Sequence, residues 1–122
     1  MILNIKPKAC PRPRVTRSGR VYYPIGYKEW IKDCREQLEE MDIPSGALHI
    51  EIVFVFHRPQ RLKRYGDRVI HDKRPDLDNC VKSVLDALPI KDDCRVSSIY
   101  ARKYYAAWNE EPCIEITIDA HK

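Results

Sequence analysis

The chain has 122 residues and a mass of 14.4 kDa, a length that fits one domain, residues 1–122, built around one hydrophobic core. Its composition, 43% hydrophobic and 33% charged, is typical of a soluble globular protein. No apolar run approaches the roughly 20 residues that span a bilayer, and no basic and apolar leader opens the chain. We therefore expect a cytoplasmic protein without a membrane partner.

The five cysteines are odd in number, widely scattered, and nowhere arranged as Cys-x-x-Cys. This pattern argues against a disulfide framework and against a structural zinc site. Composition thus disfavours the small disulfide-rich and zinc-stabilised classes of domain.

The net charge of +4 is unevenly distributed along the chain. Residues 1–28 contain several lysines and arginines and no acidic residue, and a second basic cluster occupies residues 58–74. Two such segments favour contact with a polyanion, although two solvated basic loops are the simpler alternative. The residues that we expect to contact a nucleic acid are Lys8, Arg12, Arg14, Arg17, Arg64, Lys73 and Arg74.

The first half of the chain predicts two strands and one helix. A short apolar run at residues 2–5 is consistent with an edge strand. Residues 1–26 form a Pro/Arg-rich basic segment whose prolines favour an extended, stiff backbone, with a turn at Ser18 and Gly19. Apolar residues at three- and four-residue steps then predict an amphipathic helix over residues 27–41. Strict alternation predicts a strand over residues 47–56.

The second half begins with a basic loop over residues 57–74, and connections of this length inside a compact domain tend to be functional. A second amphipathic helix is predicted after Pro75, and strands are predicted over residues 95–105 and 114–118. The order of elements indicates an α+β (α/β) fold, a single domain with a small mixed sheet of about four strands packed against two helices.

Acidic residues gather around the second helix. Asp76 and Asp78 lie at its start, and Asp92 and Asp93 follow soon after its end. Each pair has a structural explanation, because aspartate caps helix N-termini and is common in turns. Capping needs only one aspartate, however, and several carboxylates from different chain positions suit Mg²⁺. The pattern therefore predicts a metal site made of Asp76, Asp78 and one of Asp92 or Asp93.

Lys82 lies beside Asp78 on a helical wheel, on the face next to the apolar one. A metal held at this site would polarise a phosphate oxygen and lower the pKa of a bound water. The Lys82 ammonium would stabilise developing charge or position that water. The expected reaction is phosphodiester hydrolysis, with the basic segments holding a nucleic acid.

These residues resemble the RusA-type Holliday-junction resolvases. The resemblance rests on Pro75-Asp-Leu-Asp-Asn79 with Lys82, then Leu85-Asp-Ala-Leu88 and Lys91-Asp-Asp93, preceded by the Pro/Arg-rich segment. It covers nearly the whole chain.

The resemblance implies a small α/β domain that forms a symmetric homodimer and cuts four-way DNA junctions with Mg²⁺. We expect Mg²⁺ as the cofactor, with Mn²⁺ able to take its place. The resemblance also implies metal-binding and catalytic roles for Asp76, Asp78 and Asp93, and a catalytic role for Lys82. We expect a Mg²⁺-dependent, structure-selective endodeoxyribonuclease that resolves Holliday junctions by paired phosphodiester hydrolysis in DNA recombination and repair. The alternatives are a non-catalytic nucleic-acid-binding module, and a nuclease of the same chemistry that acts on other branched DNA.

Overall fold

A five-stranded mixed sheet forms the centre of the computed structural model, which describes residues 1–121. Its long strands are β4 (Leu48–Phe56), β6 (Val96–Tyr105) and β7 (Cys113–Ala120), and the short strands β1 (Ile2–Leu3) and β5 (Val69–Ile70) lie at its edges. The strand order is β1-β7-β4-β6-β5, with β4 and β6 parallel and the other neighbours antiparallel. The predicted α+β fold with a mixed sheet is confirmed.

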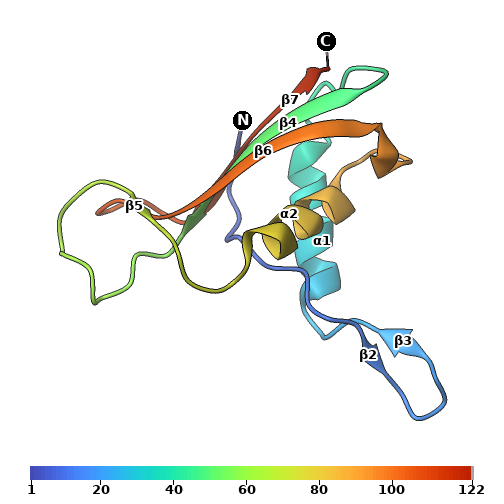
Figure 1. Ribbon diagram of the computed structural model, residues 1–122, viewed down its shortest axis with the longest axis horizontal. Coiled ribbons are helices and arrows are strands. Elements are labelled where there is room, and N and C mark those ends of the chain that lie inside the picture. Colours follow the sequence, from blue (N-terminus) through green and yellow to red (C-terminus); the bar gives the residue numbers. More distant parts are fainter. Residues whose placement is uncertain (122) are drawn as a thin grey trace.

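Two helices, α1 (Tyr27–Leu38) and α2 (Leu77–Ala87), cover one face of this sheet (Figure 1). Alternation along β4 buries one set of side chains against both helices, namely Leu48, Ile50, Ile52 and Phe54. Helix α2 lies in the connection between β4 and β6. Because parallel neighbours need a crossover, this connection places α2 against the sheet.

Helix α1 is shorter than the predicted helix over residues 27–41. It begins after Gly26, whose φ of 100° lies in the left-handed region that glycine adopts readily. It ends at Leu38, because the N–H groups of Glu40 and Met41 bond to carbonyls only three residues back and so close a tighter turn. Within residues 1–121, no helix has both the length and the apolar character needed to cross a bilayer.

The structure contains short strands that the sequence pattern does not predict. Strand β5 brings the main sheet to five strands, and β2 (Arg14–Val15) pairs with β3 (Val21–Tyr22) in a separate hairpin. Each of these strands has two residues and both are exposed, so no alternation marks them in the sequence. The predicted turn at Ser18 and Gly19 is the turn of this hairpin, which projects away from the sheet (Figure 1).

The basic loop between β4 and β5 has a defined conformation that depends on Arg58. The Arg58 guanidinium donates hydrogen bonds to three backbone carbonyls, those of Lys63 and Asp67 at 3.0 Å and that of Ala106 at 3.2 Å. Since Ala106 follows β6, these bonds fasten the loop to the end of the sheet.

Candidate active site

Asp76 and Asp78 lie at the N-terminus of α2, where the sequence predicts them. Asp76 occupies the N-cap position with an extended backbone, but its side chain accepts no capping hydrogen bond. Asp78 lies in the first turn and accepts a hydrogen bond from the N–H of Asn79 at 3.0 Å. Both side chains are exposed, and neither forms an ion pair within residues 1–121. Capping therefore does not account for Asp76, and the helix dipole favours two carboxylates at this end.

The backbone that leads into α2 is held by Lys103, a residue that the sequence reasoning missed. Lys103 lies on β6, and its ammonium donates to the carbonyl oxygen of Pro75 at 2.6 Å and to that of Lys73. It pairs in register with Phe54, which is fully buried under the helices, so Lys103 also faces the helices. The sequence carries no local signal for this role, because the register shift between β4 and β6 decides which side chains of β6 face the helices.

The N-terminal segment, residues 6–10, packs against both α2 and α1. The N–H of Cys10 donates to the carbonyl of Asn79 at 2.9 Å, and the Ser83 hydroxyl donates to the carbonyl of Lys8 at 2.5 Å. The indole N–H of Trp30, on α1, donates to the carbonyl of Lys6 at 2.8 Å. Hydrogen bonds thus hold the backbone of this segment to the two helices, and they place the basic residue Lys8 next to α2.

Lys82 lies one turn after Asp78 and has an exposed side chain. Its ammonium lies 3.8 Å from the Asp86 carboxylate. Asp86 has a second partner in α1, because its other oxygen accepts a hydrogen bond from the Tyr27 hydroxyl at 2.7 Å. Burial, and then hydrogen bonding to Cys10 and Asp86, raises the pKa of Tyr27, so its proton stays on the hydroxyl. Asp86 therefore joins the two helices, while Lys82 remains available to solvent.

Asp92 and Asp93 have different surroundings, although they are neighbours in sequence. Asp92 caps the short 3₁₀ helix η1 (Asp93–Arg95), because its carboxylate accepts a hydrogen bond from the N–H of Cys94 at 3.0 Å. This bond lowers the pKa of Asp92. Asp93 is exposed and makes no side-chain hydrogen bond or ion pair within residues 1–121. Asp92 thus has a structural partner, whereas the Asp93 carboxylate is uncommitted.

The structure does not gather the three predicted metal ligands into one cluster. Within residues 1–121, no group of three or more His, Cys, Asp or Glu side chains is placed to hold a metal ion. The exposed carboxylates of Asp76 and Asp78, which form no ion pair among the described residues, nevertheless fit Mg²⁺. Proteins commonly bind this ion through one or two carboxylates plus waters and substrate phosphate. The contribution of Asp93 to a metal site stays a prediction.

The seven predicted nucleic-acid contacts are all exposed. The backbone of Lys8 lies next to α2, and Lys73 and Arg74 come shortly before α2 in the chain. Arg14 lies on the β2–β3 hairpin, and Arg17 lies at its turn. Figure 1 shows this hairpin and the basic loop after β4 on opposite sides of the molecule, with α2 between them. Arg12 precedes the hairpin and Arg64 lies in the loop. The acidic pair thus lies between two basic segments.

A mixed sheet covered by two helices, with an exposed acidic pair between basic segments, is consistent with the class of small nucleic-acid enzymes. The family described as Endodeoxyribonuclease RusA matches residues 4–119, and the chain belongs to this family. The predicted resemblance is therefore confirmed. A search of curated proteins gives no significant match.

Proposed function

We propose that this protein is a Mg²⁺-dependent, homodimeric endodeoxyribonuclease that resolves Holliday junctions in DNA recombination and repair, with Mn²⁺ able to replace Mg²⁺. Membership of the RusA family supports endonuclease activity. The observation that carries the proposal is the pair Asp76 and Asp78, whose carboxylates are exposed at the start of α2 without an ion-pair partner among residues 1–121. Uncompensated carboxylates in a basic surrounding suit a metal that bridges protein and phosphate.

Asp76 and Asp78 would hold the metal, and Asp93 would add a third carboxylate. Bound Mg²⁺ supplies Lewis acidity towards phosphate and lowers the pKa of a coordinated water. The Lys82 ammonium, exposed one turn into α2, would stabilise negative charge that develops on the phosphate. Lys73 and Arg74, which lead into the acidic pair, would bind the neighbouring phosphates and orient the strand.

A dimer follows from the symmetry of the proposed substrate. A four-way junction must be cut in two symmetry-related strands, and a two-fold dimer presents two equal sites. The basic hairpin and basic loop on opposite sides of α2 are consistent with a substrate wider than one duplex arm (Figure 1).

The test compares cleavage of a labelled four-way junction with cleavage of a linear duplex of the same sequence, with and without Mg²⁺. The proposal predicts paired nicks near the branch point of the junction, only in the presence of the metal. Salt-sensitive binding without cleavage in any metal would identify a non-catalytic binding module instead. Equal cleavage of flaps and junctions would indicate a nuclease for branched DNA in general.

A further inference from the structure

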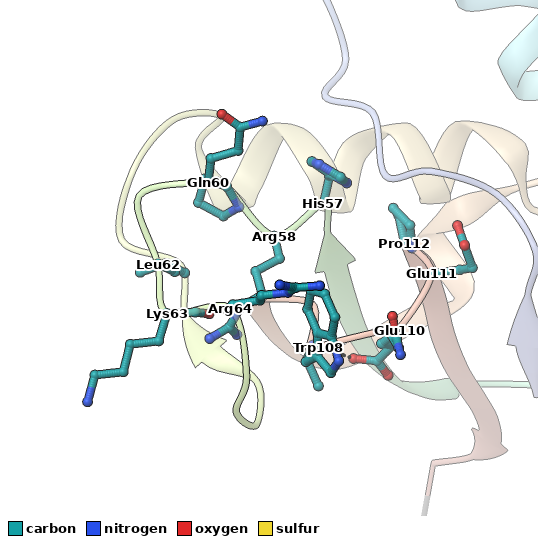
Figure 2. Close-up of a pocket in the computed structure, with 13 residues that line it drawn as sticks. His57, Arg58, Gln60, Leu62, Lys63, Arg64, Trp108, Glu110, Glu111 and Pro112 are labelled. Atoms are coloured by element: carbon teal, nitrogen blue, oxygen red, sulfur yellow. Dashed lines mark hydrogen bonds between the residues drawn. The ribbon is translucent and has the colours of Figure 1, made fainter.

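A pocket of about 500 Å³ lies between the basic loop after β4 and the turn that joins β6 to β7 (Figure 2). Among the described residues, its lining does not include Asp76, Asp78, Lys82 or Asp93. It is therefore separate from the candidate active site, and the proposed chemistry does not use it.

Arg64 and Trp108 line one wall of the pocket, and Tyr65, which lies outside the lining, packs against Trp108; these three residues are called the aromatic platform. The rings of Tyr65 and Trp108 meet edge to face, with centroids 5.0 Å apart and an interplanar angle of 65°. The Arg64 guanidinium carbon lies 5.2 Å from the centre of the Trp108 ring and 5.5 Å from that of Tyr65. Both rings remain open to solvent, Trp108 at 38% and Tyr65 at 64%. Such a surface can take a flat ring on its exposed face.

The platform is held in place before any ligand arrives. The backbone N–H of Trp108 donates to the carbonyl of Gly66 at 3.0 Å, and this bond joins the turn to the loop. Arg68 adds a second tie, because its guanidinium lies 2.6 Å from the carboxylate of Glu110 in the turn and 2.9 Å from that of Glu115 on β7. A preformed pocket loses little conformational entropy when it binds.

The charges around the pocket favour an anionic chain with aromatic rings. Lys63 and Arg64 line it, are exposed and form no ion pair within residues 1–121. Glu110 also lines it, but hydrogen bonding to Arg68 lowers the pKa of Glu110 and compensates its charge. Glu111 is the remaining carboxylate of the described lining, and it is exposed to solvent. Phosphates beside the pocket would meet the two cations at its rim.

We propose that this pocket binds an unpaired nucleobase of single-stranded DNA, stacked on Trp108, with the adjoining phosphates on Lys63 and Arg64. The proposal rests on the proposed function, because it takes DNA as the substrate. Stacking needs a base with an open face, so bases inside a duplex cannot use the platform, whereas bases unpaired at a branch point can. The pocket would thus select for locally unpaired DNA at some distance from the acidic pair.

The test uses single-stranded oligothymidine of about ten nucleotides, a length typical of single-strand sites, with EDTA present. The chain has two tryptophans, and Trp30 is only 8% exposed, so in the wild type quenching of fluorescence by the oligonucleotide reports on Trp108. The affinities of all variants are compared by fluorescence anisotropy of a labelled oligothymidine, because the Trp108 variants lack the reporting ring. Loss of one stacked base should weaken binding at least about fivefold in Trp108→Ala and in Tyr65→Ala. Trp108→Phe keeps a stacking ring, so its affinity should stay within about twofold of the wild type.

Tyr100→Ala is the matched control. Tyr100 is also an exposed aromatic beneath a guanidinium, with Arg102 at 4.9 Å from its ring centre, but it lies on β6 outside the pocket lining. Its substitution should leave the affinity for oligothymidine unchanged.

The proposal is overturned if oligothymidine does not bind, or if the Trp108→Ala and Tyr65→Ala variants bind as tightly as the Tyr100→Ala control. Equal quenching by a duplex of the same length also overturns it. Since EDTA prevents metal-dependent hydrolysis, none of these results bears on nuclease activity. Conversely, a protein that binds oligothymidine through Trp108 but cuts no junction contradicts the proposed nuclease and leaves the base-binding pocket supported.

Discussion

Replacement of Lys103 by methionine tests how the entry to α2 is held. The change keeps the length of the side chain but removes the ammonium that donates to the carbonyls of Lys73 and Pro75, the latter at 2.6 Å. Hydrogen bonds from a charged donor contribute about 1.5–3 kcal/mol each when buried. Because Lys103 is only half-buried, water replaces part of this. We expect a loss of about 2 kcal/mol in the free energy of unfolding, or a fall of roughly 8 °C in melting temperature.

The larger effect should appear in catalysis. The backbone of residues 73–75 leads directly into Asp76, and a shift of about 1 Å in a catalytic group can cost about a hundredfold in rate. Single-turnover cleavage of a four-way junction at saturating Mg²⁺ should therefore fall by about 10- to 100-fold. Junction binding in EDTA, followed by fluorescence anisotropy, should change by less than about threefold, because the exposed phosphate contacts remain.

Lys32→Met serves as the control, since Lys32 is an exposed lysine on α1. It should match the wild type in melting temperature and in cleavage. The reasoning is refuted if Lys103→Met retains both. A lowered melting temperature with full cleavage would show that Lys103 stabilises the fold without positioning the acidic pair.

Three further predictions follow from single contacts. Asp93→Asn should reduce junction cleavage at least about a hundredfold, whereas Asp92→Asn should stay near wild type because asparagine also caps helices; the reverse result would make Asp92 the third ligand. Burial lowers the pKa of His71 below its usual 6.5, so the folded protein binds this proton less readily than the unfolded chain. Stability should thus fall as the pH drops below 6.5, and His71→Phe should flatten this part of a plot of urea midpoint against pH; an unchanged slope would contradict the assignment. Tyr27→Phe removes the hydrogen bond to Asp86 and should cost about 1–2 kcal/mol in urea unfolding, a prediction that an unchanged midpoint would contradict.

The parts of the fold that the sequence predicts are those with a repeating pattern of burial. Alternation over β4 and three- to four-residue spacing over α1 correspond to side chains that are buried at those intervals. The two-residue strands β2, β3 and β5 have exposed side chains, and they form because of pairing with a neighbour, which no local pattern records.

The register of β6 against β4 is a second feature that the sequence does not predict. Its register with β4 shifts between Leu48 and His49, which pair with Val96 and Ser98, so one residue of β6 is skipped. The shift decides which side chains of β6 face the helices, and therefore places Lys103 beneath α2. The hydrogen bond from Lys103 to the carbonyl of Pro75 joins residues 28 positions apart, and only the folded chain brings them together.

The candidate site was predictable in its residue types but not in their surroundings. The motif around Asp76 and Asp78 predicts an acidic pair at a helix start, and the structure places both residues there. The sequence cannot say which of Asp92 and Asp93 is engaged, because that depends on the hydrogen bond from Cys94 to Asp92. A contact of this kind depends on the turn geometry, and not on the identity of either aspartate.

The central claim is that this protein makes paired cuts in branched DNA, and a supercoiled plasmid that extrudes a cruciform tests it most directly. Two cuts made within one binding event convert the plasmid to linear DNA, whereas independent single cuts produce nicked circles first. We predict Mg²⁺-dependent conversion to linear DNA without accumulation of nicked circles, and no conversion of a plasmid that lacks the inverted repeat. Nicked circles as the main product, or equal cutting of both plasmids, would contradict the account.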